Sequence, residues 1–389
     1  MGAGVFSLPW AVAQGGLAFV PLFILAAALL ALYTLRILVD AKRALVALAP
    51  GPSAGLEVSA AVSSYTGLVE ASLGQVWGRA AEVMNLACCF GICSAYLVFV
   101  ASTLASVAPG LGAGGSLAGA SLQNTLVWAI TPPMVGLAWL RSMAGVSLMA
   151  MLGNASVLLG MAFVTWFSTT QPWQAAALPL WAPQTFGSYF GSVAFLFFIH
   201  FTMPAIEAAM AQPARFMAVA TRGFGICAAA GCAFGALGAA AFGPGVSSVV
   251  ITQLGSTSLA TAVKLLLCVN LLFTFPIVCR SAFLIIETLF ERGGVALNTL
   301  QTRALRAAFV VLASTVATSV PSFGALLNLV GGVSLSLISL VFPPCILLLA
   351  RTPQGQALLP RSALERAWAA LITALGLAIL VYTIATGLA

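Results

Sequence analysis

Near the amino end, one stretch reads Gly2-Ala3-Gly4-Val5-Phe6-Ser7-Leu8-Pro9, inside an uncharged run that covers residues 1–35. Glycine frees the backbone, and proline removes an amide donor and clashes with the preceding helical turn. A second stretch, His200-Phe201-Thr202-Met203-Pro204, places a titratable side chain and a proline inside another uncharged run. A hydrophobic anchor has no need of such interruptions. Both stretches therefore predict apolar helices that are broken partway along.

The rest of the chain is too apolar for a soluble protein. Of its 389 residues, 61% are hydrophobic and only 6% are charged, whereas soluble domains carry about 25% charged residues. Because about 20 apolar residues span a bilayer as a helix, we expect an integral, multi-pass membrane protein. A soluble enzyme is excluded. The 15 Lys and Arg residues outnumber 8 Asp and Glu, but they are too scattered to indicate a nucleic-acid partner.

The uncharged runs and turn residues predict about eleven membrane-spanning helices. Their approximate bounds are 2–16, 19–40, 82–107, 124–140, 145–168, 187–211, 216–242, 259–285, 304–321, 324–350 and 367–387. Lys and Arg fall on alternate connections, and the loops 109–123, 169–186 and 243–258 contain none. By the positive-inside rule, the amino terminus and the basic connections are cytosolic. Only fourteen residues precede Gly15, so we expect the chain to be truncated within its first helix.

The two broken helices are the first and the sixth span, five places apart in the order of spans, which is the spacing expected of a transporter with two inverted five-helix repeats. We predict one transporter domain over residues 1–389, with repeats at about 1–168 and 187–350 and an extra helix at 367–387. Free N–H groups at half-helix ends attract a carboxylate. A packing kink at each break is the alternative. The predicted substrate-binding residues of the two breaks are Gly2, Ala3, Gly4, Phe201, Thr202 and Met203.

Four further side chains are candidates for the site. His200 and Glu207 are ionisable groups within a span, which marks them as candidates for ion coupling. The alternatives are a neutral hydrogen-bonded gate or packing role for His200 and, for Glu207, an ion pair with Arg280 or a place near the cytosolic end of the span. Thr274 offers a hydroxyl beside Pro276, although bonding back onto its own helix is the usual role of a lone threonine. Tyr96 either reaches the substrate carboxylate or is a core aromatic residue.

Five motifs follow one another along nearly the whole chain. They are Gly2 to Ala11; Ser64-Tyr65 with Glu70, Gly74, Gly78 and Arg79; His200 with Pro204, Ile206, Met210, Pro213, Arg215 and Phe216; Thr274-Phe275-Pro276 with Arg280-Ser281; and Phe342-Pro343-Pro344. In this order they resemble the amino acid/auxin permease family, which includes vacuolar, vesicular and proton-coupled amino acid transporters. Two positions differ from the family's motifs. Ile199 stands where the family usually has a glycine before the sixth-helix histidine, and Gly67 stands where it commonly has an acidic residue after the tyrosine that is Tyr65 here.

The resemblance implies an all-α, leucine-transporter-type fold with broken helices 1 and 6. It also implies a secondary active transporter that moves small amino acids by alternating access. We expect a proton as the coupling ion; sodium, held by Thr274 and carbonyls of the first helix, stays open. An amino acid sensor and a non-transporting fragment are competing interpretations of the same residues.

The expected partners are a small amino acid and the lipid bilayer. We expect no catalytic residue, no cofactor, no metal centre, no nucleic acid and no obligate protein partner. The vacuolar or lysosomal membrane and the plasma membrane both stay open as locations.

Overall fold

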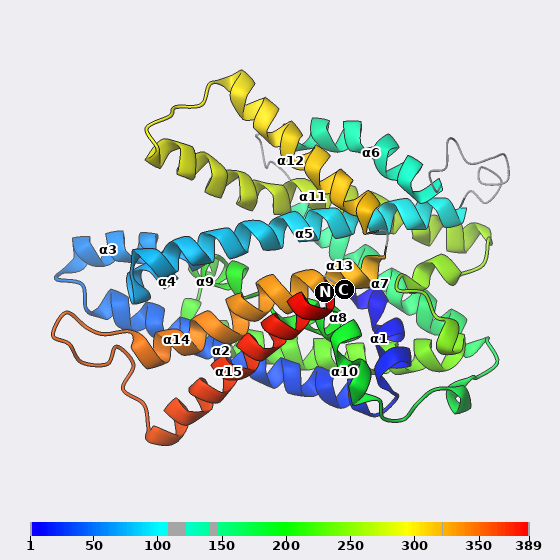
Figure 1. Ribbon diagram of the computed structural model, residues 1–389, viewed down its shortest axis with the longest axis horizontal. Coiled ribbons are helices and arrows are strands. Elements are labelled where there is room, and N and C mark those ends of the chain that lie inside the picture. Colours follow the sequence, from blue (N-terminus) through cyan, green and yellow to red (C-terminus); the bar gives the residue numbers. More distant parts are fainter. Residues whose placement is uncertain (1, 108–121, 140–145, 321, 388–389) are drawn as a thin grey trace. The chain divides into compact units, whose positions relative to one another are not determined.

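The structure, a computed structural model, describes residues 2–107, 122–139, 146–320 and 322–387, and these are almost wholly helical (Figure 1). The α-helices are α1 (Leu8–Gly15), α2 (Phe19–Ala47), α3 (Pro52–Ala61), α4 (Tyr65–Leu73), α5 (Gln75–Val107), α6 (Leu122–Ala138), α7 (Val146–Thr169), α8 (Phe186–Phe197), α9 (Met203–Ala209), α10 (Phe216–Phe242), α11 (Ser258–Arg292), α12 (Thr299–Ser319), α13 (Phe323–Val330), α14 (Phe342–Leu349) and α15 (Ala363–Gly387). Apart from one isolated bridge between Arg351 and Ala357, these residues form no β structure. The predicted all-α class is confirmed.

Eight stretches of the described chain are long and apolar enough to cross a membrane. They are Phe19–Ala47, Gln75–Val107, Met151–Thr169, Pro183–Ala209, Pro213–Gly245, Ser258–Arg292, Phe323–Leu349 and Ala363–Ala385, and each overlaps a predicted span. The other three predicted spans are also helical, but residues 3–15 and α6 are short, and α12 carries Arg303 and Arg306 near its start. The protein is thus a multi-pass membrane protein. Most of the predicted loop 109–123 lies outside the described residues.

Local capping explains where several helices begin. At α12, the Asn298 side chain accepts from the Gln301 amide and the Gln301 side chain accepts from the Asn298 amide, both at 2.9 Å. This reciprocal pair satisfies two amides that the helix leaves without partners. Ser64 caps α4 by accepting from the Gly67 amide at 3.1 Å. The helices α3 and α4 were not predicted, because charged and small residues interrupt the apolar pattern there.

Gly16 ends α1 in a conformation that favours glycine. Its φ is +106°, and a Cβ at this position would lie 2.6 Å from the carbonyl oxygen of Leu180. A side chain here would be strained and would also collide with the backbone. Gly16 therefore fixes the turn that leads from the first helix into α2.

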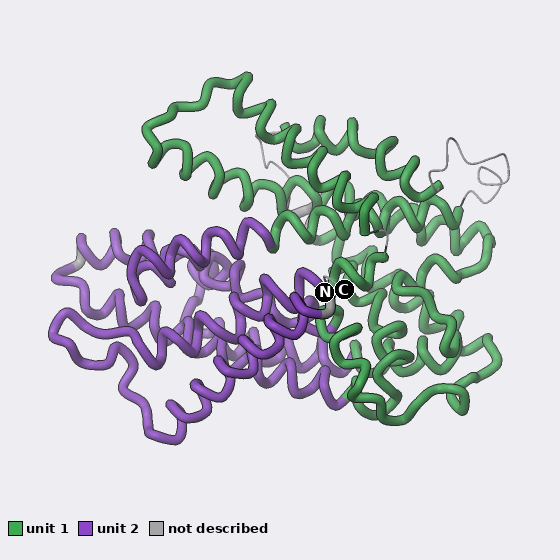
Figure 2. The backbone as a smooth tube through the Cα atoms, in the orientation of Figure 1, with its two compact units in different colours: residues 1–21, 88–192, 231–328 green, residues 22–87, 193–230, 329–389 purple. Residues whose placement is uncertain are grey.

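The chain forms two compact units, shown in green and purple in Figure 2. Unit 1 comprises residues 1–21, 88–192 and 231–328, and unit 2 comprises residues 22–87, 193–230 and 329–389. In unit 1, α7 packs along α11 and α6 along α12; in unit 2, α14 packs against α15 and α4. Each unit draws on both halves of the chain, and the division into two repeats stays a prediction.

The tenth predicted span contains wide turns that the sequence did not indicate. Two π-helical segments, η10 (Gly331–Leu335) and η11 (Leu337–Val341), separate α13 from α14. Tyr65 of α4 donates a hydrogen bond of 2.6 Å to the carbonyl oxygen of Ile338 in this region. Burial raises the pKa of Tyr65, so its hydroxyl stays a donor at physiological pH. Such π-turns are rare and frequently occur at functional sites.

Candidate functional site

The first break lies in unit 1. The short 3-10 segment η1 (Ala3–Ser7) leads into α1, which has Pro9 in its first turn. There the missing amide of proline costs nothing, since the first amides of a helix have no partner within it. The Ser7 hydroxyl donates to the Gly4 carbonyl at 2.7 Å, and the Val5 amide donates to the Gly2 carbonyl at 3.2 Å. The predicted interruption is confirmed. Ala3 and Gly4 are the first residues of η1, so no carbonyl within η1 accepts a hydrogen bond from their amides.

Aromatic side chains of unit 1 hold this segment. The ring of Phe6 is fully buried, and its centroid lies 6.0 Å from those of both Phe99 and Phe234. Tyr96, one of the predicted substrate contacts, is buried three residues before Phe99 on α5. Residues three apart lie on one face of a helix. The structure therefore brings Tyr96 and the first break to the same part of unit 1. A Cβ at Gly2 would meet no atom within 4 Å, so packing alone does not require this glycine.

Thr274 of α11 bonds to its own helix. Its hydroxyl donates to the Asn270 carbonyl at 2.8 Å and lies 3.3 Å from the Asn270 side-chain oxygen. Back-bonding of this kind is common for threonine in helices. The contact matches the structural role expected of a lone threonine.

The second break lies mainly in unit 2. After α8 ends at Phe197, the 3-10 segment η6 (His200–Thr202) leads into α9, with Pro204 in its first turn. The Thr202 hydroxyl donates to the Ile199 carbonyl at 2.8 Å, which ties the turn together. The predicted interruption of the sixth span is confirmed. Its residues Phe201, Thr202 and Met203 belong to unit 2, whereas Gly2, Ala3, Gly4, Tyr96 and Thr274 belong to unit 1.

His200 is held by α2 through one ring nitrogen. The residue is only 1% exposed. Its Nε2 lies 2.8 Å from the Thr34 hydroxyl oxygen and 3.1 Å from the Ala31 carbonyl oxygen. Within the described part of the chain, its Nδ1 has no hydrogen-bond partner. The ring is thus fixed on one side and has a free acceptor or donor position on the other.

Glu207 forms a buried ion pair with α2. Its Oε2 lies 2.7 Å from the Nζ of Lys42, and the two side chains are 6% and 10% exposed. Lys42 also donates to the Pro204 carbonyl at 3.3 Å. The structure thus pairs Glu207 with Lys42, whereas the sequence analysis named Arg280 as the alternative partner.

Sequence reasoning missed both Thr34 and Lys42. The second span was predicted to end at residue 40, so Lys42 was read only as a marker of a cytosolic connection, yet α2 runs to Ala47. A signal was present, because residues eight apart differ by about 80° around a helix and so can share one face roughly 100° wide. A hydroxyl and an ammonium at that spacing indicate one polar face within an apolar span.

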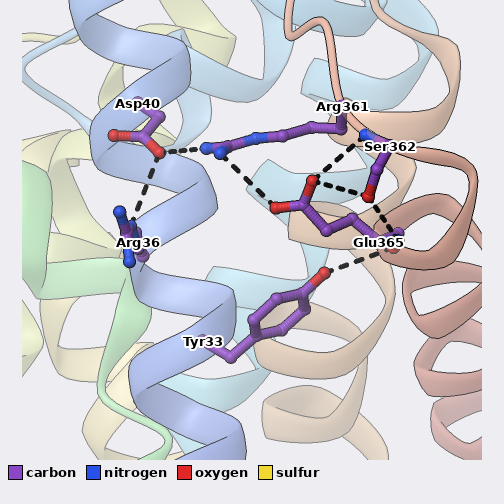
Figure 3. Close-up of polar contacts among 6 residues, drawn as sticks. All are labelled: Tyr33, Arg36, Asp40, Arg361, Ser362 and Glu365. Atoms are coloured by element: carbon purple, nitrogen blue, oxygen red, sulfur yellow. Dashed lines mark hydrogen bonds and ion pairs between the residues drawn. The ribbon is translucent and has the colours of Figure 1, made fainter.

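A further polar cluster in unit 2 joins α2 to the start of α15 (Figure 3). Arg361 donates to Asp40 of α2, and its Nη1 lies 3.5 Å from Glu365 Oε1. The Tyr33 hydroxyl donates to the backbone carbonyl of Glu365 at 3.4 Å. A cavity of about 100 Å³ beside the cluster is lined by Tyr33, Arg36, Ile37, Leu347, Arg361 and Glu365.

Comparison with known sequences decides the family. A family profile described as "Transmembrane amino acid transporter protein" matches residues 1–388. The chain belongs to this family. It is 26% identical over 356 residues to the amino acid transporter AVT3C of Arabidopsis thaliana, covering 88% of this chain and 78% of that protein. It is also 26% identical to AVT3B of the same plant over 352 residues, covering 88% and 80%. This member of the amino acid transporter family is therefore not an enzyme.

Solved structures confirm the fold of this amino acid transporter. The crystal structure of MhsT in complex with L-phenylalanine has a TM-score of 0.57 at 14% identity and covers 100% of this chain and 96% of that chain. A manganese transporter of Eremococcus coleocola has a TM-score of 0.59 at 12% identity and covers 100% and 84%. At such low identity the likeness shows the fold alone, and it confirms the predicted leucine-transporter-type fold with broken helices 1 and 6.

Proposed function

We propose that this family member is a secondary active transporter that moves small amino acids by alternating access and is driven by a proton gradient. One observation supports the choice of a proton as the coupling ion. His200, the one histidine of the chain, is buried at the break of the sixth span. Its Nδ1 has no hydrogen-bond partner among the described residues. Ionisable groups inside membrane helices mark ion pathways. Histidine changes charge close to physiological pH. The names of the plant relatives, which are amino acid transporters, support the substrate class.

The proposed substrate site uses backbone groups. In unit 1, Gly2, Ala3 and Gly4 at the first break would offer groups to the substrate carboxylate, with the Tyr96 hydroxyl as a further contact. In unit 2, residues 201–203 at the second break are the other candidate contacts. Neither broken stretch carries Lys or Arg, so backbone amides are the donors available there. The positive ends of half-helices suit a carboxylate within a membrane.

The proposed coupling residues differ in what surrounds them. His200 would carry the proton. Glu207 is neutralised by Lys42 at 2.7 Å, which leaves its carboxylate a supporting role. Thr274 donates its hydroxyl hydrogen to its own helix at 2.8 Å, and it is the residue whose replacement would disturb a sodium site.

An uptake experiment tests the coupling. The purified chain is reconstituted in liposomes, and uptake of radiolabelled glycine, alanine, serine and proline is measured under an inward pH gradient with and without sodium. We expect His200→Ala to abolish stimulation by the gradient while the substrate KM changes little. Thr274→Ala serves as the sodium control and keeps the wild-type pH profile. Uptake that requires sodium and is unaffected by His200→Ala would show the proton assignment to be wrong; binding without uptake would favour the sensor.

A binding experiment tests the substrate site. A valine at position 4 would place a branched side chain among the proposed amide donors. We expect Gly4→Val to abolish binding of the radiolabelled amino acid while the protein stays monodisperse in size-exclusion chromatography. The matched control is Gly223→Val on α10, where a Cβ would meet no atom within 4 Å. Unchanged affinity of Gly4→Val, normalised to folded protein, contradicts the proposed site.

A further inference from the structure

One face of α2 contacts the broken sixth span at two levels within unit 2. Ala31 and Thr34 contact His200, and Lys42, about two turns further along α2, contacts Pro204 and Glu207. Ala31 and Thr34 have no exposed surface at all. Both helices run in the same direction along this contact. The helix α2 therefore fixes the orientation of the His200 ring as well as the position of α9.

The contacts to Ala31 and Thr34 identify which ring nitrogen carries hydrogen. A carbonyl oxygen only accepts, so the nitrogen that faces Ala31 at 3.1 Å must donate. The Thr34 hydroxyl has acceptors of its own, the carbonyls of Leu30 at 3.1 Å and Ala31 at 3.2 Å. It can therefore donate to one of them and accept from Nε2 at 2.8 Å. The neutral ring is then the Nε2–H tautomer, with the lone pair on Nδ1.

We propose that the Ala31 carbonyl and the Thr34 hydroxyl together fix the Nε2–H tautomer of His200, with Thr34 as a positioning residue, so that Nδ1 is the atom that takes up and releases the coupled proton. This inference rests on the proposed proton coupling. A proton from water on one side of the membrane adds to the Nδ1 lone pair and gives an imidazolium ion with hydrogen on both nitrogens. Its release to water on the other side restores the neutral ring. The Nε2–H bonds to α2 persist throughout the cycle.

In the described chain, none of the charged groups on the elements nearest His200 is its hydrogen-bond partner. Among these elements, α9, α4 and η11 pack against η6, and α2 contacts His200. Lys42 and Glu207 pair with each other, and α2 also carries Tyr33, Arg36, Asp40 and Arg43, of which the first three belong to the cluster of Figure 3. On α4 the ionisable groups are Tyr65, bonded to Ile338, and Glu70, which packs beside Gly78; η11 has none. Within the described chain, Thr34 and Ala31 are the hydrogen-bond partners of His200.

The test compares Thr34→Val with Thr34→Ser in the liposome assay. Valine keeps the shape and removes the hydroxyl acceptor, whereas serine keeps the hydroxyl. Bonds to a charged donor are stronger than bonds to a neutral one. For Thr34→Val we expect the pH of half-maximal uptake to move about 0.7 unit to the acid side, which is a roughly fivefold change in proton concentration. The KM at saturating proton concentration stays close to the wild-type value, and Thr34→Ser restores the profile.

A second readout does not depend on transport. Because the chain has a single histidine, protein labelled with 15N-histidine and purified through a histidine-free tag gives NMR signals from one ring. We expect a protonated Nε2 and an unprotonated Nδ1 in the wild type at neutral pH. In Thr34→Val the Ala31 carbonyl is the remaining acceptor of Nε2–H, so we expect a larger share of the Nδ1–H tautomer than in the wild type.

The outcomes separate the two proposals. A wild type that ignores the pH gradient overturns the proton coupling and this inference together. Two results with a proton-driven wild type overturn this inference alone. One is a wild-type ring protonated on Nδ1, and the other is a Thr34→Val variant whose pH profile and ring signals match those of the wild type.

Discussion

Replacing Lys42 by methionine removes the ammonium that neutralises a buried carboxylate. Lys42 Nζ lies 2.7 Å from Glu207 Oε2, and both side chains are at most 10% exposed. Methionine has a similar length and fills the same space, so the change removes charge and leaves packing nearly intact. What remains is a carboxylate in an apolar surrounding without a counter-charge. We therefore expect Lys42→Met to destabilise the protein strongly.

The magnitude follows from the burial of the pair. Breaking a buried ion pair by removing one partner costs about 3–5 kcal/mol. At about 2.1 cal/mol/K per residue, unfolding of the 389 residues carries an entropy of roughly 0.8 kcal/mol/K. The melting temperature should then fall by roughly 4–6 °C.

Thermal stability in detergent, followed by fluorescence-detected size-exclusion chromatography, measures this fall. The neighbouring Arg43 is exposed, and Arg43→Met should change Tm by only about 1 °C, since exposed charges contribute about 0–1 kcal/mol. The double variant Lys42→Met/Glu207→Gln has no unpaired charge and should recover about half of the loss or more. A Lys42→Met variant as stable as Arg43→Met, or a double variant worse than the sum of its single changes, would refute the reasoning.

Three further predictions concern topology and packing. Cysteines introduced by Ser256→Cys and Gln354→Cys, both at exposed positions, should react with a membrane-impermeant maleimide from opposite sides of the membrane. The reason is that, of the two connections, only the one that contains Gln354 is basic. Labelling of both cysteines from the same side would contradict the predicted topology. Gly191→Ala should lower stability by about 1–3 kcal/mol, because a Cβ there would lie 2.1 Å from a backbone atom of α13. Gly223→Ala, in open space within α10, should keep or raise the stability by up to about 1 kcal/mol, because alanine favours a helix more than glycine does. Equal Tm values for the two variants would refute the close approach at Gly191. Lys264→Met should keep or raise Tm, since Lys264 is 2% exposed and its ammonium has one carbonyl acceptor among the described residues. A fall in Tm would assign Lys264 a stabilising partner.

The features that the sequence predicted are those that depend on local chemistry. Glycine and proline alter the backbone where they stand, so Gly2, Gly4 and Pro204 located both breaks. The length and polarity of apolar runs likewise located the spans. The predicted second span ends at residue 40, whereas the helix α2 continues to Ala47. Lys42 was read as a solvated charge, yet it is buried in an ion pair with Glu207.

The contacts between distant residues were beyond the reach of such reasoning. Thr34 and His200 are 166 residues apart in the chain, and their contact depends on which face α2 turns toward the sixth span. Glu207 needed a cation, and the sequence offered Arg280 as readily as Lys42. The π-turns of the tenth span were missed for a related reason, since their wider hydrogen bonding leaves no signature in an apolar run of small residues.

The pairing of Lys42 with Glu207 also has an electrical consequence. A membrane potential does work on net charge, about 2.3 kcal/mol per elementary charge for each 100 mV. Since the two charges cancel at 2.7 Å, a movement that carries both together produces no current. A zwitterionic amino acid is likewise neutral. Under the proposed coupling, the charge that crosses the membrane in each cycle is carried by the coupling ion. The current recorded per substrate molecule under voltage clamp would then count those ions directly.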